Sequence, residues 1–526
     1  MTRASRPRAT AALLVLVTVA AAVFLRFWRL RWALDDDLFF PDEIVWFARV
    51  SQFVPLTWAS FDVDFTHFYP TLFGYLAGLP TAAAWALGLI RKSHALFDAV
   101  LVARVVTALV GVANVALACL LGWRCFSAPV GLVAAAFMAV LPLDTVQAHY
   151  ASVDGLVTAW FVLALLAAHA LALRGGVGRA LLGGACVGLA FATKYTGIGV
   201  LGAFAVPLVV RARSGDGLAV AAGLGTAVVA GVGLGVVVGC PPCVLRPDDL
   251  LGALRMHFET TATADLLNAR LVPSLGWVGT PWVYELVAVF PFGLGWPLWL
   301  LSLAGIAVAL RRRTLADWVL LGGVGTYFVA IGASPALFPR YLLPLAPGLL
   351  VLAARAGATL ARRSAAGATV VAAIWLYTFV LSASHVASAS LEQQKDLIAW
   401  ITARPETVPG TRVAFPARGA EYFFLPQFLT RAGLTPLPMA DGDWLRAPAD
   451  VFVVPELLAI GSRRDHPDGA AARDLARLEA GEGGYREAAR WPMRYMNDRL
   501  YAWLDPGLSP VLGTVGFRVY VRDRPR

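Results

Sequence analysis

Apolar runs about as long as a membrane span recur along the chain from Ala11 to Val386. A helix crosses the hydrocarbon core of a bilayer with roughly 20 apolar residues. These runs predict a polytopic helical membrane protein rather than a soluble fold. We place about eleven spans at residues 11–33, 99–122, 128–146, 155–173, 179–196, 197–210, 217–239, 286–310, 315–333, 342–360 and 366–386.

Basic residues give these spans an orientation, because short cytoplasmic loops carry an excess of Lys and Arg. The basic clusters all fall on one side of the membrane when the spans alternate in this order. The clusters are Arg3/Arg6/Arg8, Arg124, Arg174/Arg179, Arg211/Arg213, Arg311/Arg312/Arg313 and Arg362/Arg363. The first cluster with the run behind it is typical of an uncleaved signal anchor.

Residues 70–90 form a further apolar stretch, and Arg91-Lys92 follow it. If this stretch crossed the membrane, every later basic cluster would change sides. One exception costs less than six, so we expect a re-entrant or interfacial helix pair that packs on the outer face, buried against protein. The extracytoplasmic side then holds the loops at 34–98, 147–154 and 240–285 and the tail from 387 onward.

The tail, residues 387–526, differs from the rest because Asp, Glu, Arg and Pro occur throughout it, with short apolar runs such as Val451–Val454 and Phe517–Val521. It predicts a small soluble α/β domain outside the membrane. The expected organisation is therefore a transmembrane catalytic domain at 1–386, all-α and integral to a plasma or inner membrane of bacterial type, and an extracytoplasmic α/β domain at 387–526.

Composition agrees with this class and excludes others. The 526 residues are 58% hydrophobic and 15% charged, with mean hydropathy +0.67, whereas soluble proteins are about one quarter charged. The net charge of +10 follows from the loop clusters, and no nucleic-acid-binding module is present in the sequence. Five cysteines are too few for a disulfide framework. Cys240 and Cys243, in a Cys-Pro-Pro-Cys motif, could form a local disulfide.

Two acidic sites lie in the predicted outer loops. Asp42 and Glu43 follow Pro41 shortly after the first span, and Asp154 opens the span at 155–173. Acidic residues next to spans are costly and usually functional. A helix N-cap explains Asp42 or Asp154 equally well from spacing alone. Asp144 is a rival to Asp154 in the same stretch.

Three cations are predicted at the same outer face: Arg104, Lys194 and Arg340. One such residue could simply extend its charge to the membrane surface. Three of them, against the usual charge bias, indicate an anionic ligand such as a lipid phosphate. His67 could contact a phosphate or a metal ion, although an ordinary interfacial histidine also fits. His257 and Glu259 are possible lining residues.

These motifs, in this order, resemble the GT-C polyprenyl-phosphate-sugar glycosyltransferases, which include protein O-mannosyltransferases and lipid A aminoarabinose transferases. The resemblance covers about residues 11–360. It is carried by Pro41-Asp42-Glu43, His67-Phe68-Tyr69-Pro70, Arg104, Tyr150–Asp154, Gly188–Lys194 and Arg340–Pro344. The chain departs from the family pattern at Phe68-Tyr69, where one proline is replaced, and at Cys-Pro-Pro-Cys.

The resemblance implies transfer of a sugar from a polyprenyl-phosphate donor to a lipid, glycan or protein acceptor, with inversion at the anomeric carbon. It implies that Asp42 is the base and that Glu43 and Asp154 orient the acceptor or tune Asp42. Arg104, Lys194 and Arg340 would hold the donor phosphate, and His67, Tyr69, Tyr195 and Tyr341 would line the substrate site. No cofactor is certain, and a divalent metal ion is possible.

Three other classes compete with this interpretation. A secondary transporter of a polar or lipid-linked substrate is the main rival, but it would need internal repeats and polar residues at mid-membrane, where Asn114 is the clearest example. An oligosaccharide ligase or polymerase would share the topology but not the early Asp-Glu motif. A membrane scaffold would leave the one-sided acids and cations unexplained.

Overall fold

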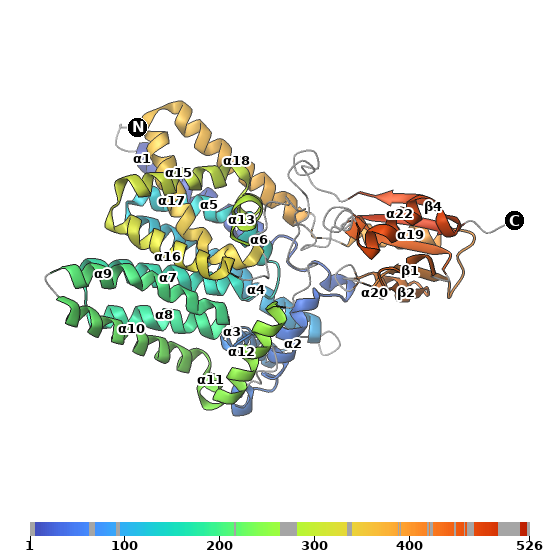
Figure 1. The fold of residues 1–526 in the computed structure, drawn as a ribbon, viewed down its shortest axis with the longest axis horizontal. Helices are drawn as coiled ribbons and strands as arrows, with labels where there is room; N and C mark the ends of the chain where they lie inside the picture. The colour runs from blue at the N-terminus through green and yellow to red at the C-terminus, as the bar shows by residue number, and fades with distance from the viewer. Residues whose placement is uncertain are drawn as a thin grey trace. The chain divides into compact units, whose positions relative to one another are not determined.

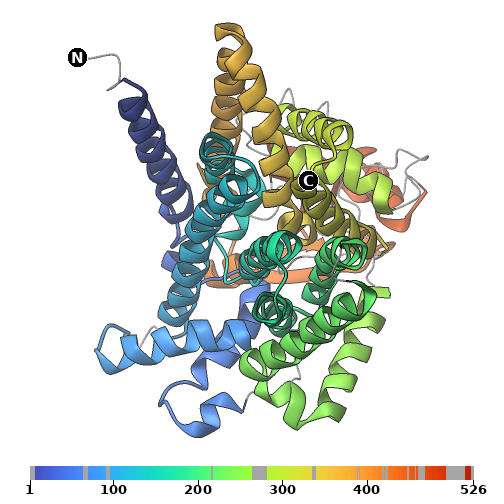
Figure 2. The same cartoon turned by 90° about the vertical axis from the view of Figure 1, so that its left-hand side faces the viewer.

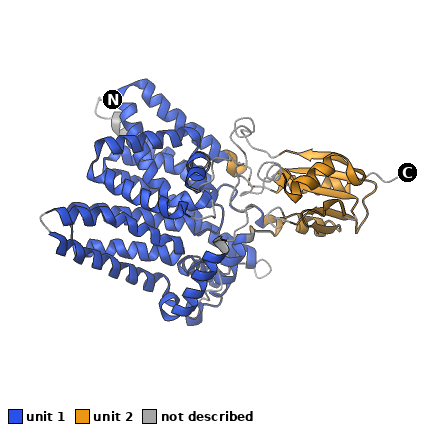
Figure 3. Cartoon of the chain, in the orientation of Figure 1, with its two compact units in different colours: residues 1–34, 42–264, 280–383 blue, residues 35–41, 265–279, 384–526 orange. Residues whose placement is uncertain are grey.

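The computed structural model is mostly helical, with one small sheet near the C-terminus. It describes residues 6–522 except 63–68, 91–94, 215–216, 263–280, 334–338, 388, 390, 418–419, 421–423, 447–448, 457, 460–467 and 493–515. The chain divides into two compact units (Figure 3). Unit 1 comprises residues 1–34, 42–264 and 280–383, and unit 2 comprises residues 35–41, 265–279 and 384–526.

Apolar helices form most of unit 1 (Figure 1). They are α1 (Arg6–Phe27), α4 (Ala95–Cys125), α5 (Ala128–Ala139), α7 (Asp154–Arg174), α8 (Val177–Thr193), α10 (Gly217–Gly239), α15 (Trp296–Arg312), α16 (Leu315–Gly332), α17 (Ala346–Arg363) and α18 (Ala365–Ala387). Figure 2 shows α1, in dark blue, at one edge of this helix bundle, where it packs on α4 and α5.

The other elements of unit 1 connect these helices and carry several of the polar motifs. The α-helices among them are α2 (Ile44–Ser51), α3 (Leu72–Ala86), α6 (Pro142–Gln147), α9 (Ala205–Arg213), α11 (Pro241–Leu245), α12 (Pro247–Ala262), α13 (Pro281–Tyr284) and α14 (Phe290–Leu294). The 3₁₀-helices are η1 (Leu34–Asp36), η2 (Pro41–Glu43), η3 (Trp58–Phe61), η5 (Tyr195–Phe204) and η7 (Pro339–Leu345), and η6 (Glu285–Val289) is a π-helix.

Seven helical segments in the described residues are long and apolar enough to cross a membrane. They are 95–125, 154–174, 195–213, 217–239, 315–332, 339–363 and 365–402. The apolar helices at 11–27, 128–139 and 177–193 are shorter. The fold class predicted from the sequence is confirmed: the chain is an integral membrane protein with a small α/β region near its C-terminus. The count of about eleven spans stays a prediction.

Helices α8 and α10 pack against each other through glycine, side by side in Figure 1. Gly184 and Gly188 of α8 face the backbone of α10, where a Cβ on Gly184 would lie 2.0 Å from the carbonyl oxygen of Val228. Gly231 and Gly235 of α10 meet α8 in the same way. Small residues four apart let two membrane helices approach closely, and van der Waals contact then replaces the missing hydrophobic driving force.

The stretch predicted at 70–90 forms one helix, α3, and not a helix pair. Its 15 residues are fewer than the roughly 20 that span a bilayer. The ring of Phe53 packs on Gly78 so closely that a Cβ there would lie 2.4 Å from it. This packing holds α3 against the segment that follows α2. The orientation of α3 relative to the membrane stays a prediction, and Arg91-Lys92 lie outside the described residues.

Unit 2 contains a five-stranded mixed sheet with strand order β2-β1-β3-β5-β4. Strands β1 (Arg412–Pro416), β2 (Thr435–Met439) and β3 (Val451–Pro455) are parallel, and β4 (Tyr485–Trp491) and β5 (Phe517–Arg522) are antiparallel to their neighbours. Helices α19 (Glu392–Thr402) and α20 (Leu425–Arg431) pack on one face, and α22 (Ala470–Glu479) packs on the other. The remaining turns are η9 (Trp444–Arg446) and η10 (Glu482–Gly484).

The central strand β3 is buried on both faces, which explains its continuous apolar run. Val451 and Val453 contact the α19 and α20 side, whereas Phe452 and Val454 contact the α22 side. Such burial is typical of strands covered by helices on both faces of a sheet. Lys395 Nζ of α19 lies 2.6 Å from Asp36 Oδ1. This ion pair links residues 35–41 to the rest of unit 2.

An ion-pair cluster lies at the end of β3. The carboxylate of Glu456 accepts hydrogen bonds from Arg490 Nε at 3.1 Å and Arg518 Nη2 at 3.1 Å, and Arg518 Nη1 donates to Glu479 Oε1 at 2.8 Å. Burial by itself would raise the pKa of Glu456, but the hydrogen bonds and charges of the two arginines outweigh it, so the pKa of Glu456 is lowered.

Acid should therefore loosen unit 2. Because the folded pKa of Glu456 is depressed, its stabilisation is complete above the ordinary carboxyl pKa of about 4.3 and is lost as pH falls through the lowered folded value. E456Q should remove this pH dependence and cost about 1–3 kcal/mol at neutral pH, since two arginines lose an acceptor. Hydrogen exchange of the β3 and β5 amides in the full chain, corrected for intrinsic rates, measures both effects. Equal acid sensitivity in E456Q and wild type would contradict this assignment.

Candidate active site

Asp42 and Glu43 are adjacent in η2, just before α2, but they lie in different environments. Successive residues of a 3₁₀-helix point about a third of a turn apart. The Glu43 side chain is 1% exposed, whereas the Asp42 side chain is 42% exposed. The two carboxylates are therefore suited to different tasks.

Glu43 forms a buried, two-pronged ion pair with Arg104 of α4. Arg104 Nε donates to Glu43 Oε1 at 2.8 Å, and Arg104 Nη2 donates to Oε2 at 2.7 Å. Arg104 Nη1 also donates to the carbonyl oxygens of Leu30 and Trp32 at 2.9 and 2.8 Å. Glu43 Oε1 accepts a further bond from the Ala151 amide at 2.9 Å. This pair ties α4 to the end of the first span and to the loop before α7.

Asp154, the first residue of α7, forms a second buried pair with Lys194, which follows α8. Lys194 Nζ lies 2.7 Å from Asp154 Oδ1, and both side chains are at most 4% exposed. Ser152 Oγ donates to Asp154 Oδ2 at 3.1 Å. Helices α7 and α8 pack side by side, so residues 40 positions apart meet at one end of this helix pair.

Asp42 and Arg340 form the third pair, the most accessible of the three. Arg340 Nη1 lies 3.1 Å from Asp42 Oδ2, and the Arg340 side chain is 22% exposed. The next residue, Tyr341, places its ring 4.1 Å from Lys194 Nζ. A cation over an aromatic ring is attracted by the ring quadrupole. The contacts therefore run continuously from Asp42 through Arg340, Tyr341 and Lys194 to Asp154, and we name these five residues the polar chain.

The rival acid, Asp144, has a different partner. It is 1% exposed and accepts from Arg26 Nε at 3.0 Å and from Arg26 Nη2 at 2.6 Å. Arg26 also donates to the carbonyl oxygens of Ala22, Met138 and Ala139. The pair therefore joins α1 to the start of α6, and we interpret Asp144 as structural. Sequence reasoning did not single out Arg26, although an arginine inside an apolar run is itself a signal for a buried partner.

The predicted lining residues fall into two groups. Tyr69 stacks on Trp46 of α2 with 5.3 Å between ring centroids, and Tyr195 meets His257 of α12 edge to face at 5.8 Å. His67 lies outside the described residues. Arg49, missed by sequence reasoning, is buried and donates to the carbonyl oxygen of Pro70 at 2.6 Å. It thereby holds the backbone beside Tyr69.

Two further features lie near these elements. Cys240 and Cys243 form a disulfide, as the sequence allowed, within a buried cluster that includes Trp46 and Phe73. Among the described residues, no group of three or more His, Cys, Asp or Glu side chains could hold a metal ion. The two acids of the polar chain, Asp42 and Asp154, instead form ion pairs with Arg340 and Lys194.

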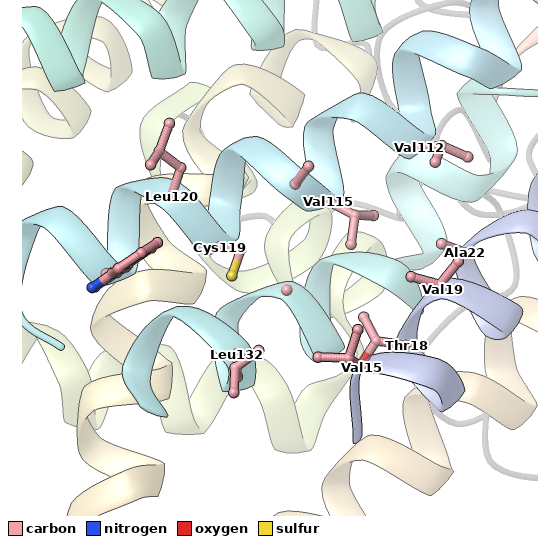
Figure 4. Close-up of a pocket in the computed structure, with 12 residues that line it drawn as sticks. Val15, Thr18, Val19, Ala22, Val112, Val115, Cys119, Leu120 and Leu132 are labelled. Atoms are coloured by element: carbon pink, nitrogen blue, oxygen red, sulfur yellow. The ribbon is translucent and has the colours of Figure 1, made fainter. Parts of the chain in front are cut away.

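A separate cavity of about 390 Å³ lies between α1, α4 and α5 (Figure 4). Its lining is apolar apart from a few groups such as Thr18 and Cys119, and it contains no charged side chain. None of the polar-chain residues lines it. This cavity offers apolar surface and no acid, base or phosphate ligand.

Comparisons with known proteins identified one family model and several solved structures that resemble this chain. The model of the dolichyl-phosphate-mannose-protein mannosyltransferase family matches residues 80–232, a segment that contains Arg104, Asp154 and Lys194. A comparison with curated proteins found no match.

Two solved structures share the fold. ArnT from Cupriavidus metallidurans, bound to undecaprenyl phosphate, superposes with a TM-score of 0.52 at 16% identity, over 96% of this chain and 97% of that one. The archaeal oligosaccharyltransferase AglB from Archaeoglobus fulgidus was solved in complex with an inhibitory peptide and a dolichol-phosphate. It superposes with a TM-score of 0.53 at 13% identity, over 94% of this chain and 75% of that one. These two structures, at 16% and 13% identity, show a shared fold, and the family match covers residues 80–232 of this chain.

Proposed function

We propose that the chain transfers a sugar from a polyprenyl-phosphate donor to a lipid, glycan or protein acceptor at the extracytoplasmic face. The observation that carries the proposal is the polar chain. It places a half-exposed carboxylate, Asp42, next to Arg340, and a second cation, Lys194, lies against the ring of the following residue, Tyr341. A base and a phosphate-binding pair of cations are the two requirements of this reaction.

The likeness to two lipid-phosphate-binding proteins supports the donor class. ArnT was solved with undecaprenyl phosphate and AglB with a dolichol-phosphate. In this chain, Arg340 and Lys194 are the cations of the polar chain, and Lys194 lies over the ring of Tyr341, the residue after Arg340. A guanidinium group suits planar, two-pronged binding of phosphate, and an ammonium group adds a compact charge.

The proposed reaction is a direct displacement. The acceptor hydroxyl gives its proton to Asp42 as its oxygen bonds to the anomeric carbon. The bond from that carbon to the phosphate oxygen breaks, and polyprenyl phosphate leaves with the electron pair, stabilised by Arg340 and Lys194. One displacement inverts the anomeric carbon. The substrate phosphate would take the place that Asp42 now occupies beside Arg340, which frees Asp42 to act as a base.

We assign Glu43, Arg104 and Asp154 supporting roles. All five donors of a guanidinium are strong, but those of Arg104 that face Glu43, Leu30 and Trp32 are already engaged, and Arg104 is buried. Arg104 is thus better suited to positioning Glu43 and the loop before α7 than to contacting phosphate. Asp154 orients Lys194 through their 2.7 Å contact.

K194M should weaken use of the donor. Purified protein in nanodiscs, given radiolabelled polyprenyl-phosphate sugars and a membrane extract as acceptor, should label a product and release polyprenyl phosphate. Loss of one charge-assisted hydrogen bond is worth about 1.5–3 kcal/mol, so the donor KM should rise roughly 10- to 100-fold. K395M is the matched control, since it removes a Lys–Asp pair in unit 2.

Two outcomes would count against the proposal. No transfer from any donor by the wild type, with labelled lipid only moved across the membrane, would favour a transporter. An unchanged donor KM in K194M would remove Lys194 from the phosphate site.

In sealed inside-out vesicles, transfer to an added acceptor should stay latent until detergent opens them, because the proposed site faces the lumen.

A further inference from the structure

Glu285 is a buried acid that the proposed mechanism does not use. It begins the π-helix η6 and is 2% exposed. Single-turn π segments are rare and often occur at functional sites, because the wide turn redirects side chains and weakens the regular backbone ladder. Glu285 also stands directly before the predicted span at 286–310.

Comparison with the other buried acids of unit 1 sets Glu285 apart. Within its described residues, unit 1 buries five acidic side chains. Four of them pair with Arg or Lys: Glu43 with Arg104, Asp144 with Arg26, Asp154 with Lys194 and Asp317 with Arg355. Among the described residues, Glu285 forms no ion pair, and its Oε2 atom has no hydrogen-bond partner. Burying a polar group without a partner costs free energy, so such a group calls for a ligand.

The surroundings of Glu285 connect it to the polar chain. Helix η6 packs on η7, which carries Arg340 and Tyr341. Helix α16, which carries the buried side chain of Tyr327, also packs on η7. The π-helix that begins with Glu285 therefore packs on the segment that carries Arg340 and Tyr341, and it contributes no cation itself.

We propose that Glu285 recognises the donor sugar by accepting hydrogen bonds from its hydroxyl or amino groups. This inference rests on the proposed function. A carboxylate repels a phosphate but is a strong acceptor for two neighbouring hydroxyl groups. In the proposed function, Arg340 and Lys194 hold the phosphate, and the sugar is bonded directly to that phosphate. Helix η6 packs on the segment that carries Arg340. The partner that Oε2 lacks is thus supplied by the substrate.

The test separates the sugar from the phosphate. Wild type, E285Q and E285A in nanodiscs are assayed with the donor that the wild type uses, and with undecaprenyl phosphate as a sugar-free inhibitor. In E285A the donor KM should rise about 10- to 100-fold, while the inhibition constant of undecaprenyl phosphate stays unchanged. E285Q keeps one acceptor oxygen in a side chain of the same shape, so its donor KM should lie between those of wild type and E285A. D317N, a buried acid of unit 1 paired with Arg355, is the control.

Each outcome decides the question. If the donor KM and the inhibition constant of undecaprenyl phosphate rise equally in E285A and E285Q, Glu285 is structural and the inference is wrong. If donor KM stays at the wild-type value in both variants, the inference is also wrong, although the proposed function stands. If E285A fails to fold, E285Q carries the same comparison. If the wild type transfers no sugar from any donor, the proposed function fails first, and the inference fails with it.

Discussion

Replacing Asp42 with asparagine should abolish sugar transfer while the protein folds normally. General base catalysis contributes about 10²- to 10⁴-fold, so D42N should lower kcat by that amount and leave the donor KM within a few-fold of wild type. Asparagine keeps the shape of aspartate but cannot take the acceptor proton. Single-turnover transfer with saturating donor measures the loss.

The exposure of Asp42 makes this test clean. Its side chain is 42% exposed, and its ion pair with Arg340 is partly open to solvent. Exposed pairs contribute about 0–1 kcal/mol, so D42N should unfold at nearly the wild-type temperature. D62N is the matched control, because Asp62 lies in the same loop and pairs with Arg246 at 2.9 Å. Transfer at the wild-type rate in D42N would rule out Asp42 as the base.

Removing Arg104 should have the largest effect on stability. R104M leaves the buried Glu43 carboxylate without its partner, and breaking a buried ion pair in this way costs about 3–5 kcal/mol. R104K should also destabilise, since one ammonium group cannot reproduce the two-pronged contact with Glu43 and the bonds to Leu30 and Trp32. Thermal unfolding of the purified protein in detergent measures the change. The readout is the amount of monodisperse protein that remains after heating.

A double variant distinguishes positioning from phosphate binding. E43M/R104M replaces the pair with apolar side chains and should recover most of the stability lost in R104M. R246M, which breaks an exposed pair, should change stability by less than about 1 kcal/mol. If R104M unfolds like the wild type and only its donor KM rises, then Arg104 binds the donor phosphate, as the sequence motif predicts.

The candidate site shows how far residue patterns reach. The sequence identifies Asp42, Glu43, Asp154, Arg104, Lys194 and Arg340 because charges next to apolar runs are exceptional. It does not say which acid meets which cation. Asp42 and Glu43 are neighbours, yet one is half exposed and the other is sealed against α4. That difference depends on the turn of η2 and on packing from residues over 50 positions away.

Glu285 and Arg26 illustrate the opposite case. Glu285 is a single charge at the edge of an apolar run, and Arg26 lies near the end of one, shortly before Arg29 and Arg31; neither belongs to a recognised motif. Their significance appears only when the partners are known: Arg26 meets Asp144, whereas Glu285 meets no cation among the described residues. A lone charge in the sequence carries no information about its partner, because that partner comes from another helix.

The sequence alone determined the membrane-helical class, the α/β character near the C-terminus and the set of charged residues worth testing. These follow from local quantities: the length of an apolar run, the period of a strand and the cost of a charge near lipid. Only the tertiary structure decided the pairing of Glu43 with Arg104, Asp154 with Lys194 and Asp42 with Arg340. Pairing requires contact between segments 40 to 298 residues apart, and such contacts are set by helix packing, which leaves no short-range pattern in the chain.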